Sequence, residues 1–282
     1  DWSQEERFIY HAGEEGITLN EEATADAIEK ALEQGEFVCT VEATVNAVLP
    51  GGNIDDLKAA TSFIASYTTK FSARRDDEVK QNRKFNIQKA ADIINGNTIQ
   101  PGEEWSFNTV VGPRTYELGW KGANGISGGK EYTIQAGGGI CQVSTTLYNA
   151  LLCANMEIVD RRAHTIPSDY VPVGLDATVD TRGIDFVWKN NTDMPAYIFA
   201  KVENVEGSSS RHTITVYVYG KPLPEGVTYQ SRNEIIEERS RQDEAIYTND
   251  ASIPTGYQLE RVQGHKYYVA EAYQDKYVDG KL

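Results

Sequence analysis

The sequence is poor in cysteine, in basic side chains and in long apolar runs, and each deficit excludes a class of protein. Three cysteines among 282 residues, Cys39, Cys141 and Cys153, are too few for a framework of disulfides to carry the fold. Lys and Arg number 27 against 42 Asp and Glu, and the net charge of −15 argues against a nucleic-acid partner. Nucleic-acid binding needs a concentrated basic surface.

Membrane-spanning and targeting segments are also missing from the sequence. No run of about 18 apolar residues occurs, so we expect no bilayer-crossing helix. The first ten residues, DWSQEERFIY, lack the basic and apolar regions of a signal peptide. The sequence is therefore that of a cytosolic protein or of a soluble part of a longer one.

The charge and the residue patterns predict an α+β protein of three modules. Residues 1–66 carry 14 acidic and 3 basic side chains, whereas residues 70–89 carry 7 basic and 3 acidic ones. This change predicts a domain boundary near residue 66. We expect a small acidic α+β module over 1–66, a mixed α+β domain over 67–220 and a β-rich module over 221–282.

The acidic segment shows one helical and one extended pattern. Asn20 is a candidate N-cap for a helix with apolar residues at helical spacing, which ends near Gly35. Residues 37–49 alternate between apolar and mostly polar side chains and predict a strand. Cys39 lies on the apolar face of that strand, so we expect it in a core.

Further along the chain, residues 82–95 form an amphipathic helical pattern, and residues 101–130 are rich in glycine, turn residues and aromatics. The second of these segments indicates loops and short strands around a surface site. From residue 184 the pattern is that of antiparallel strands, which continues through 221–282.

The segment GGGICQVSTTLYNALL, residues 137–152, is the most informative part of the sequence. Three glycines precede a helical stripe and place Cys141 in the first turn of a helix, where unpaired N–H groups and the helix dipole favour a thiolate. Two interpretations stay open here: a nucleophile with an oxyanion site, or a tight turn with a small packed cysteine. Cys153, twelve residues on, points elsewhere and is assigned to the core.

A thiolate catalyst needs a base and a group that orients the base. Four histidines are available: His11, His164, His212 and His265. His11 lies in the acidic segment, His212 opens a predicted strand after a serine-rich turn, and His265 lies in the last module. His164 is therefore the candidate base, and Asp176 and Asp180 are candidates to orient it. Arg161 and Arg162 are candidate clamps for a substrate carboxylate, or exposed ion pairs of little consequence.

Metal and phosphate chemistry find little support in the sequence. It contains no HExxH, no CxxC and no GxxxxGK[ST] pattern, and its histidines are dispersed. We therefore expect no metal site and no cofactor.

Three motifs together resemble the VanW family. They are NGNTIQPGEEWSFNTVVG, GGGICQVSTTLYNALL and RRAHTIPSDYVPVGLDATVD, which occur in the family's order within residues 68–200. Residues 1–60 more loosely resemble the end of a peptidoglycan-binding module, and residues 221–282 resemble the β-rich extension that follows the domain in many members.

The resemblance implies a bacterial surface protein with an N-terminal membrane anchor outside this chain, located at the extracellular face or cell wall. It implies a cysteine L,D-transpeptidase that joins donor and acceptor stem peptides of peptidoglycan through a thioester. A cysteine peptidoglycan hydrolase and a non-catalytic wall-binding or glycopeptide-resistance module are the alternatives.

Carried onto this sequence, the resemblance makes Cys141 the nucleophile and His164 the base, with Asp176 as the chosen third member. We assign six further residues to oxyanion stabilisation and substrate binding: Gly139, Gln142, Ser144, Arg161, Tyr170 and Trp105. Three more aromatics are candidates to line the substrate groove: Trp120, Tyr116 and Tyr148.

Overall fold

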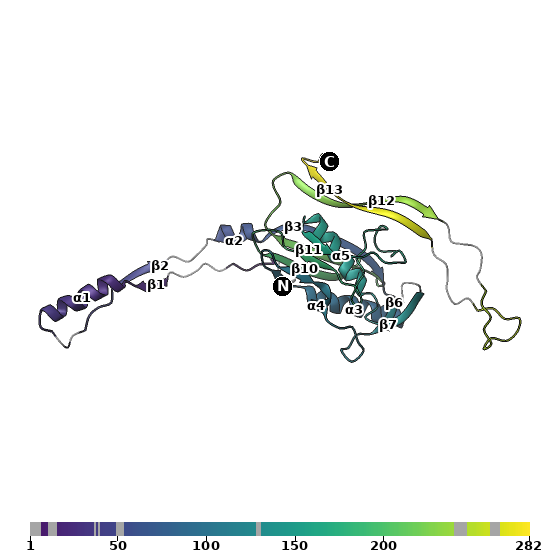
Figure 1. The fold of residues 1–282 in the computed structure, drawn as a ribbon, viewed down its shortest axis with the longest axis horizontal. Helices are drawn as coiled ribbons and strands as arrows, with labels where there is room; N and C mark the ends of the chain where they lie inside the picture. The colour runs from purple at the N-terminus through teal and green to yellow at the C-terminus, as the bar shows by residue number, and fades with distance from the viewer. Residues whose placement is uncertain are drawn as a thin grey trace. The chain divides into compact units, whose positions relative to one another are not determined.

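A computed structural model of the chain describes residues 7–10, 16–36, 38, 40–48, 54–127, 131–239, 247–259 and 266–282. The chain divides into two compact units, Asp1–Ala60 and Thr61–Leu282 (Figure 1). Both helices and strands occur in each unit, so the α+β class is confirmed.

The first unit contains β1 (Gly16–Leu19), α1 (Glu21–Glu33), β2 (Val45–Val48) and α2 (Ile54–Ala60). Asn20 caps α1 as predicted, because its side-chain oxygen accepts the Ala23 amide at 3.0 Å. The apolar stripe of α1 is not buried: Ile28 and Leu32 remain 46% and 47% exposed.

The predicted strand over 37–49 is shorter than expected. Of the described residues in this range, Val45–Val48 form the strand, because β1 offers four residues for antiparallel pairing, from Gly16 opposite Val48 to Leu19 opposite Val45. Phe37 and Cys39 lie outside the described residues, so the prediction of a core position for Cys39 stays a prediction.

The second unit is built on a four-stranded antiparallel sheet. Its order is β3 (Ser62–Ser72), β11 (Arg211–Gly220), β10 (Ala196–Asn204) and β4 (Asn97–Ile99). Helix α5 (Ile140–Cys153) packs on β3 and β11, α3 (Glu78–Ile94) packs on β10, and the two helices contact each other (Figure 1). The core of the unit lies between these helices and the sheet.

That core consists of aliphatic and aromatic side chains without solvent exposure. Ile87 and Ile94 of α3 and Leu147 and Leu151 of α5 are 0% exposed, as is Ile198 of β10. Each such side chain contributes about 1.5–3 kcal/mol by leaving water. The predicted helix over 82–95 is confirmed, although it begins earlier, after an Asp77 N-cap.

Smaller elements surround this core. They are α4 (Phe107–Val111), the sheet β5 (Glu104–Ser106), β9 (Val187–Lys189) and β8 (Glu157–Asp160), and the hairpin β6 (Gly122–Ser127) with β7 (Glu131–Ala136). A second, longer hairpin pairs β12 (Val227–Arg239) with β13 (Tyr267–Val278), and the two strands run side by side in Figure 1.

The long hairpin is attached to the part of the unit that carries α5. The Gln274 side chain donates to the Leu152 carbonyl at 2.7 Å, and the Asn233 side chain donates to the Val173 carbonyl at 3.1 Å. Residue 66 lies inside the continuous strand β3, and Thr61–Leu282 forms one compact unit. The division into three modules stays a prediction.

Among the described residues, no helix has both the length and the apolar character that crossing a bilayer would require.

Candidate active site

A glycine turn starts α5 and fixes the position of Cys141. Gly139 is the N-cap in the left-handed region, with φ of 103°, and Gly137 has φ of 79°. A Cβ added at Gly138 would lie 2.3 Å from the Ala123 carbonyl oxygen of β6. Gly137 and Gly139 are thus glycines because other residues rarely adopt their positive φ, and Gly138 is a glycine because the backbone of β6 approaches it so closely.

Two arginine stems fill the space beside the other two glycines. A Cβ at Gly137 would lie 2.8 Å from Cβ of Arg114, and a Cβ at Gly139 would lie 2.6 Å from Cγ of Arg83. The space that the missing Cβ atoms leave at the three glycines is therefore filled by β6 and by these two arginine side chains, all from the same chain.

Cys141 is half-buried at the start of α5 and faces the loop that precedes β9. Its Sγ lies 3.7 Å from Oγ1 of Thr178 and 3.4 Å from the carbonyl oxygen of Val179. Burial alone would raise the pKa of Cys141, but the hydrogen bond and the positive charge of His164 lower it below the ordinary thiol value. The thiolate is thus favoured by a neighbouring imidazolium.

His164 lies between the cysteine and a buried carboxylate. Its ring Nδ1 and its backbone N–H both bond Oδ2 of Asp176, the backbone bond at 2.7 Å. Because Asp176 occupies Nδ1, Nε2 is the ring nitrogen that remains available to Cys141. Burial lowers the pKa of His164, but the bonds to Asp176 and Cys141 outweigh it and raise the pKa to about 9.

Asp176 is 4% exposed and is held in place from two sides. Burial raises its pKa, whereas the hydrogen bonds from the His164 ring and backbone bring the pKa below its ordinary value. The Arg161 guanidinium adds a positive charge 3.6 Å from Oδ1. The structure thus brings Cys141, His164 and Asp176 together as a Cys–His–Asp set.

Asp180, the other candidate orienter, lies elsewhere. Its Oδ1 accepts the amides of Arg182 at 2.8 Å and Ile184 at 3.0 Å, and it pairs with the exposed Arg182 side chain. It therefore closes the turn before β9, and it has no bond to His164.

Several residues assigned to substrate binding instead hold the site together. Arg161 donates from Nε to the Asp176 carbonyl at 2.7 Å and from its terminal nitrogen to the Gly174 carbonyl, so it supports the loop and does not present a free clamp. Its guanidinium also lies over the Tyr148 ring, 5.0 Å from the centroid. Arg162 is exposed.

Gln142 and Ser144 have similar supporting positions. Gln142 is fully buried, and its side chain donates to Thr69 Oγ1 and the Lys70 carbonyl, each at 3.0 Å. Its backbone N–H, expected to stabilise an oxyanion, already donates to the Gly139 carbonyl at 3.0 Å. The Ser144 hydroxyl donates to the Ala177 carbonyl at 2.6 Å and joins α5 to the loop of Asp176.

The aromatic candidates separate into core and surface. Trp105 is 5% exposed, and its indole N–H donates to Asn97 at 2.9 Å, so it packs in the core and its assignment to substrate binding stays a prediction. Trp120 and Tyr148 are 3% and 6% exposed, whereas Tyr116 is 58% exposed. Tyr170 lies beside the site: burial and the charge of Cys141 raise its pKa.

The remaining cysteine and histidines lie away from the Cys–His–Asp set. Cys153 ends α5 and packs against the core, and burial raises its pKa. His212 is 2% exposed in β11, and its ring packs against the ring of Phe71. His11 and His265 lie outside the described residues.

The residues that sequence reasoning missed are Thr178 and Val179, which contact the sulfur, and Arg83 and Arg114, which flank the glycine turn. None of them stands out in the sequence, because each comes to the site only through the fold. The described residues contain no cluster of three His, Cys, Asp or Glu side chains suited to a metal.

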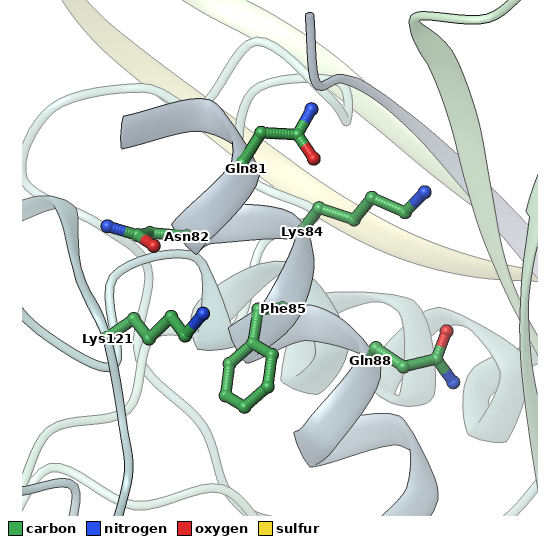
Figure 2. A pocket seen from close by; sticks show the side chains of 6 residues that line it. All are labelled: Gln81, Asn82, Lys84, Phe85, Gln88 and Lys121. Atoms are coloured by element: carbon green, nitrogen blue, oxygen red, sulfur yellow. The ribbon is translucent and has the colours of Figure 1, made fainter. Parts of the chain in front are cut away.

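A surface pocket on α3 is a separate feature. Figure 2 shows it around Phe85, with Lys84 and Lys121 on either side and three amide side chains, Gln81, Asn82 and Gln88. None of the Cys–His–Asp residues lines it, so the pocket and the candidate active site are different places.

Comparison with known proteins places this site in a family. Residues 82–214 match the family model described as VanW like protein. An uncharacterized protein of Bacillus subtilis, YoaR, is 42% identical over 142 residues, which cover 50% of this chain and 45% of the relative.

Vancomycin B-type resistance protein VanW of Enterococcus faecalis is 31% identical over 130 residues, 44% of this chain and 47% of that protein. The chain thus spans about half the length of the curated relatives it matches. No solved structure matches the chain.

Proposed function

Because this chain belongs to the VanW family through residues 82–214, we propose that it is a cell-wall enzyme, a cysteine L,D-transpeptidase that forms 3-3 crosslinks in peptidoglycan. A relation to the cell wall is supported by the name of one relative, a vancomycin B-type resistance protein. The cysteine chemistry is supported by the site itself.

One observation carries the proposal: His164 bonds the buried carboxylate of Asp176 through Nδ1, and the hydrogen bond and charge of His164 lower the pKa of Cys141. A carboxylate that fixes the imidazole, an imidazole that faces a sulfur, and a thiol whose pKa is lowered are the parts of an activated cysteine nucleophile. A merely packed cysteine would need neither the histidine nor the buried carboxylate.

The reaction follows from these parts. The Cys141 thiolate attacks the carbonyl carbon of the L-centred diamino acid at position three of a donor tetrapeptide. The C–N bond to the terminal D-Ala breaks, and His164 gives its Nε2 proton to the leaving amine. A thioester on Cys141 remains.

The second half-reaction transfers the acyl group. The side-chain amine of an acceptor stem attacks the thioester, His164 takes the amine proton, and the C–S bond breaks to restore the thiolate. The Cys141 amide donates no backbone hydrogen bond to the described residues, and we assign it to the oxyanion of both steps.

The proposed reaction implies the binding partners of the protein and its location. Donor and acceptor are stem peptides of peptidoglycan, which lie on the outer side of a bacterial membrane, so we place the protein at the extracellular face or in the wall. Residues 1–60 are proposed to act as part of a peptidoglycan-binding module.

Intact mass spectrometry with a defined disaccharide-tetrapeptide tests the proposal. We expect an acyl adduct on the wild type and on Cys153→Ala, and none on Cys141→Ala. Cys153 is a matched control because it is a half-buried free thiol at the opposite end of the same helix.

The products separate the alternatives. New 3-3 dimers that disappear in Cys141→Ala support transfer, whereas shortened monomers without dimers indicate a cysteine peptidoglycan hydrolase. A wild type that forms no adduct and no product would leave the non-catalytic wall-binding or glycopeptide-resistance module.

A further inference from the structure

The site contains a second arginine whose hydrogen-bonding capacity is only partly used. Arg114 donates from one terminal nitrogen to Oδ1 of Asn108 at 2.7 Å and to the Gly112 carbonyl at 3.1 Å. Its Nε and its other terminal nitrogen donate no hydrogen bond to the described residues. A guanidinium in that state retains the two parallel N–H groups that recognise a carboxylate.

Two series of contacts connect Arg114 to the two segments that hold the nucleophile. The Arg114 stem packs on Gly137, whose carbonyl accepts the Ile140 amide at 3.2 Å, next to Cys141. On its other side, Asn108 donates to the Asp180 carbonyl at 3.0 Å. Asp180 follows Val179, whose own carbonyl lies 3.4 Å from the cysteine sulfur.

The charge around Arg114 is consistent with this position. Burial lowers the pKa of Arg114, and the negative charges of Cys141, Asp180 and Asp185 oppose that change. Neither aspartate forms an ion pair with Arg114 among the described residues. Asp185 bonds the Ser106 hydroxyl and the Asn108 amide, at 2.6 and 2.9 Å.

Arg161, one of the two arginines that the sequence offered as candidate carboxylate clamps, is occupied by two backbone carbonyls. We therefore infer that Arg114 is the residue that binds a carboxylate of the donor, the free terminal carboxylate of the amino acid that leaves. This inference rests on the proposed function. It makes Arg114 a specificity-determining residue that selects donors with one residue beyond the scissile bond.

Equilibrium binding tests this without requiring turnover. Calorimetry on the full chain carrying Cys141→Ala compares a disaccharide-tetrapeptide that has a free terminal carboxylate with the same compound as its terminal amide. We expect the carboxylate to bind about 10- to 100-fold more tightly, the range of a charge-assisted hydrogen bond in a partly buried site.

Substitutions then assign the preference to Arg114. Arg114→Gln should reduce carboxylate binding to the level of the amide and leave amide binding unchanged. Arg114→Lys keeps the aliphatic part and the charge of the side chain but loses the two parallel N–H groups of the guanidinium. It should recover part of the preference for the carboxylate. Arg75→Gln is the matched control, because Arg75 is exposed and has no hydrogen bond or ion pair among the described residues.

The outcomes separate this inference from the proposed function. Equal binding of the two compounds, or an equal loss of both in Arg114→Gln, overturns the role of Arg114 even if the wild type is acylated. A carboxylate preference that depends on Arg114 supports the inference even if no acyl adduct forms, in which case only the transferase proposal fails. Iodoacetamide labelling of Cys141 in the Arg114 variants of the otherwise wild-type chain checks that the turn is intact.

Discussion

At the scale of single residues, the chemistry of the site depends on a charge balance among three side chains. Cys141 loses its proton more readily because His164 holds one, and His164 holds its proton because Asp176 is ionised and buried beside it. The pKa shift of each of these residues therefore depends on the charge of its neighbour. Substitution of any one of the three changes the pKa values of the other two.

The pH dependence of Cys141 alkylation tests this balance. A lowered pKa keeps the thiolate populated below the ordinary thiol range, so iodoacetamide should label wild-type Cys141 readily at neutral pH. In His164→Gln the largest influences that lower the pKa of Cys141 are lost, and only the hydrogen bonds to Val179 and Thr178 still oppose burial. The pKa should therefore rise, and labelling at neutral pH should slow by about tenfold or more, one pKa unit being tenfold. Peptide mass spectrometry measures each cysteine separately.

In the same experiment Cys153 is the control, and the pKa of His164 sets the pH above which the effect should disappear. Burial raises the pKa of Cys153, so its labelling should begin only at higher pH and be the same in both proteins. As pH rises through about 9, the folded-state pKa of His164, the imidazolium is lost and the two Cys141 profiles should converge. If the labelling rate of Cys141 had the same pH dependence in the wild type and in His164→Gln, the pairing of Cys141 with His164 would be contradicted.

At the scale of elements, the site depends on close packing between β6 and the glycine turn that precedes α5. Gly138 tolerates no Cβ, because the nearest atom would be the Ala123 carbonyl oxygen at 2.3 Å, and a backbone atom cannot swing away. The long hairpin acts on the same region, since Asn233 holds the Val173 carbonyl, three residues before Asp176. Strand and hairpin contacts thus fix both ends of the Cys–His–Asp set.

Gly138→Ala should accordingly destabilise the protein by about 1–3 kcal/mol, the usual range for an overpacked position. Urea unfolding followed by tryptophan fluorescence measures the change in midpoint. Gly125→Ala is the matched control: the three atoms nearest to an added Cβ there all belong to the side chain of Gln135, which can rotate aside. A midpoint equally lowered in both variants would contradict the argument from backbone contact.

At the scale of the whole molecule, the chain consists of two units with different degrees of burial. None of the described residues of α1 or α2 is buried, whereas α3 and α5 each bury a full face. The hydrophobic core and the Cys–His–Asp set both belong to Thr61–Leu282. Most of the folding free energy of the described chain should therefore come from that unit.

Removal of residues 1–60 should leave the second unit folded. We expect the fragment 61–282 to keep the main thermal transition of the full chain and the same rate of Cys141 alkylation, since none of the core residues is removed. Differential scanning calorimetry and peptide mass spectrometry measure the two quantities. Loss of the transition or of Cys141 reactivity in the fragment would show that the first unit is needed for the second.

The sequence by itself determined the elements whose signals are local. Asn20 as an N-cap, the α3 and α5 stripes, the strands after residue 184 and the glycine turn before Cys141 all depend on neighbours a few residues apart. The pairing of Cys141 with His164 was a hypothesis from residue types and family resemblance, because no local pattern joins positions 23 residues apart.

Only the tertiary structure decided which polar groups remain free at the site. Arg161 and Arg114 are the same residue type, yet backbone carbonyls of a folded-back loop occupy the first and leave part of the second unused. Trp105 enters the core because β5 pairs with β9 and places it opposite Trp188. Such assignments depend on long-range contacts, which are set by packing between distant segments and leave no periodic pattern along the chain.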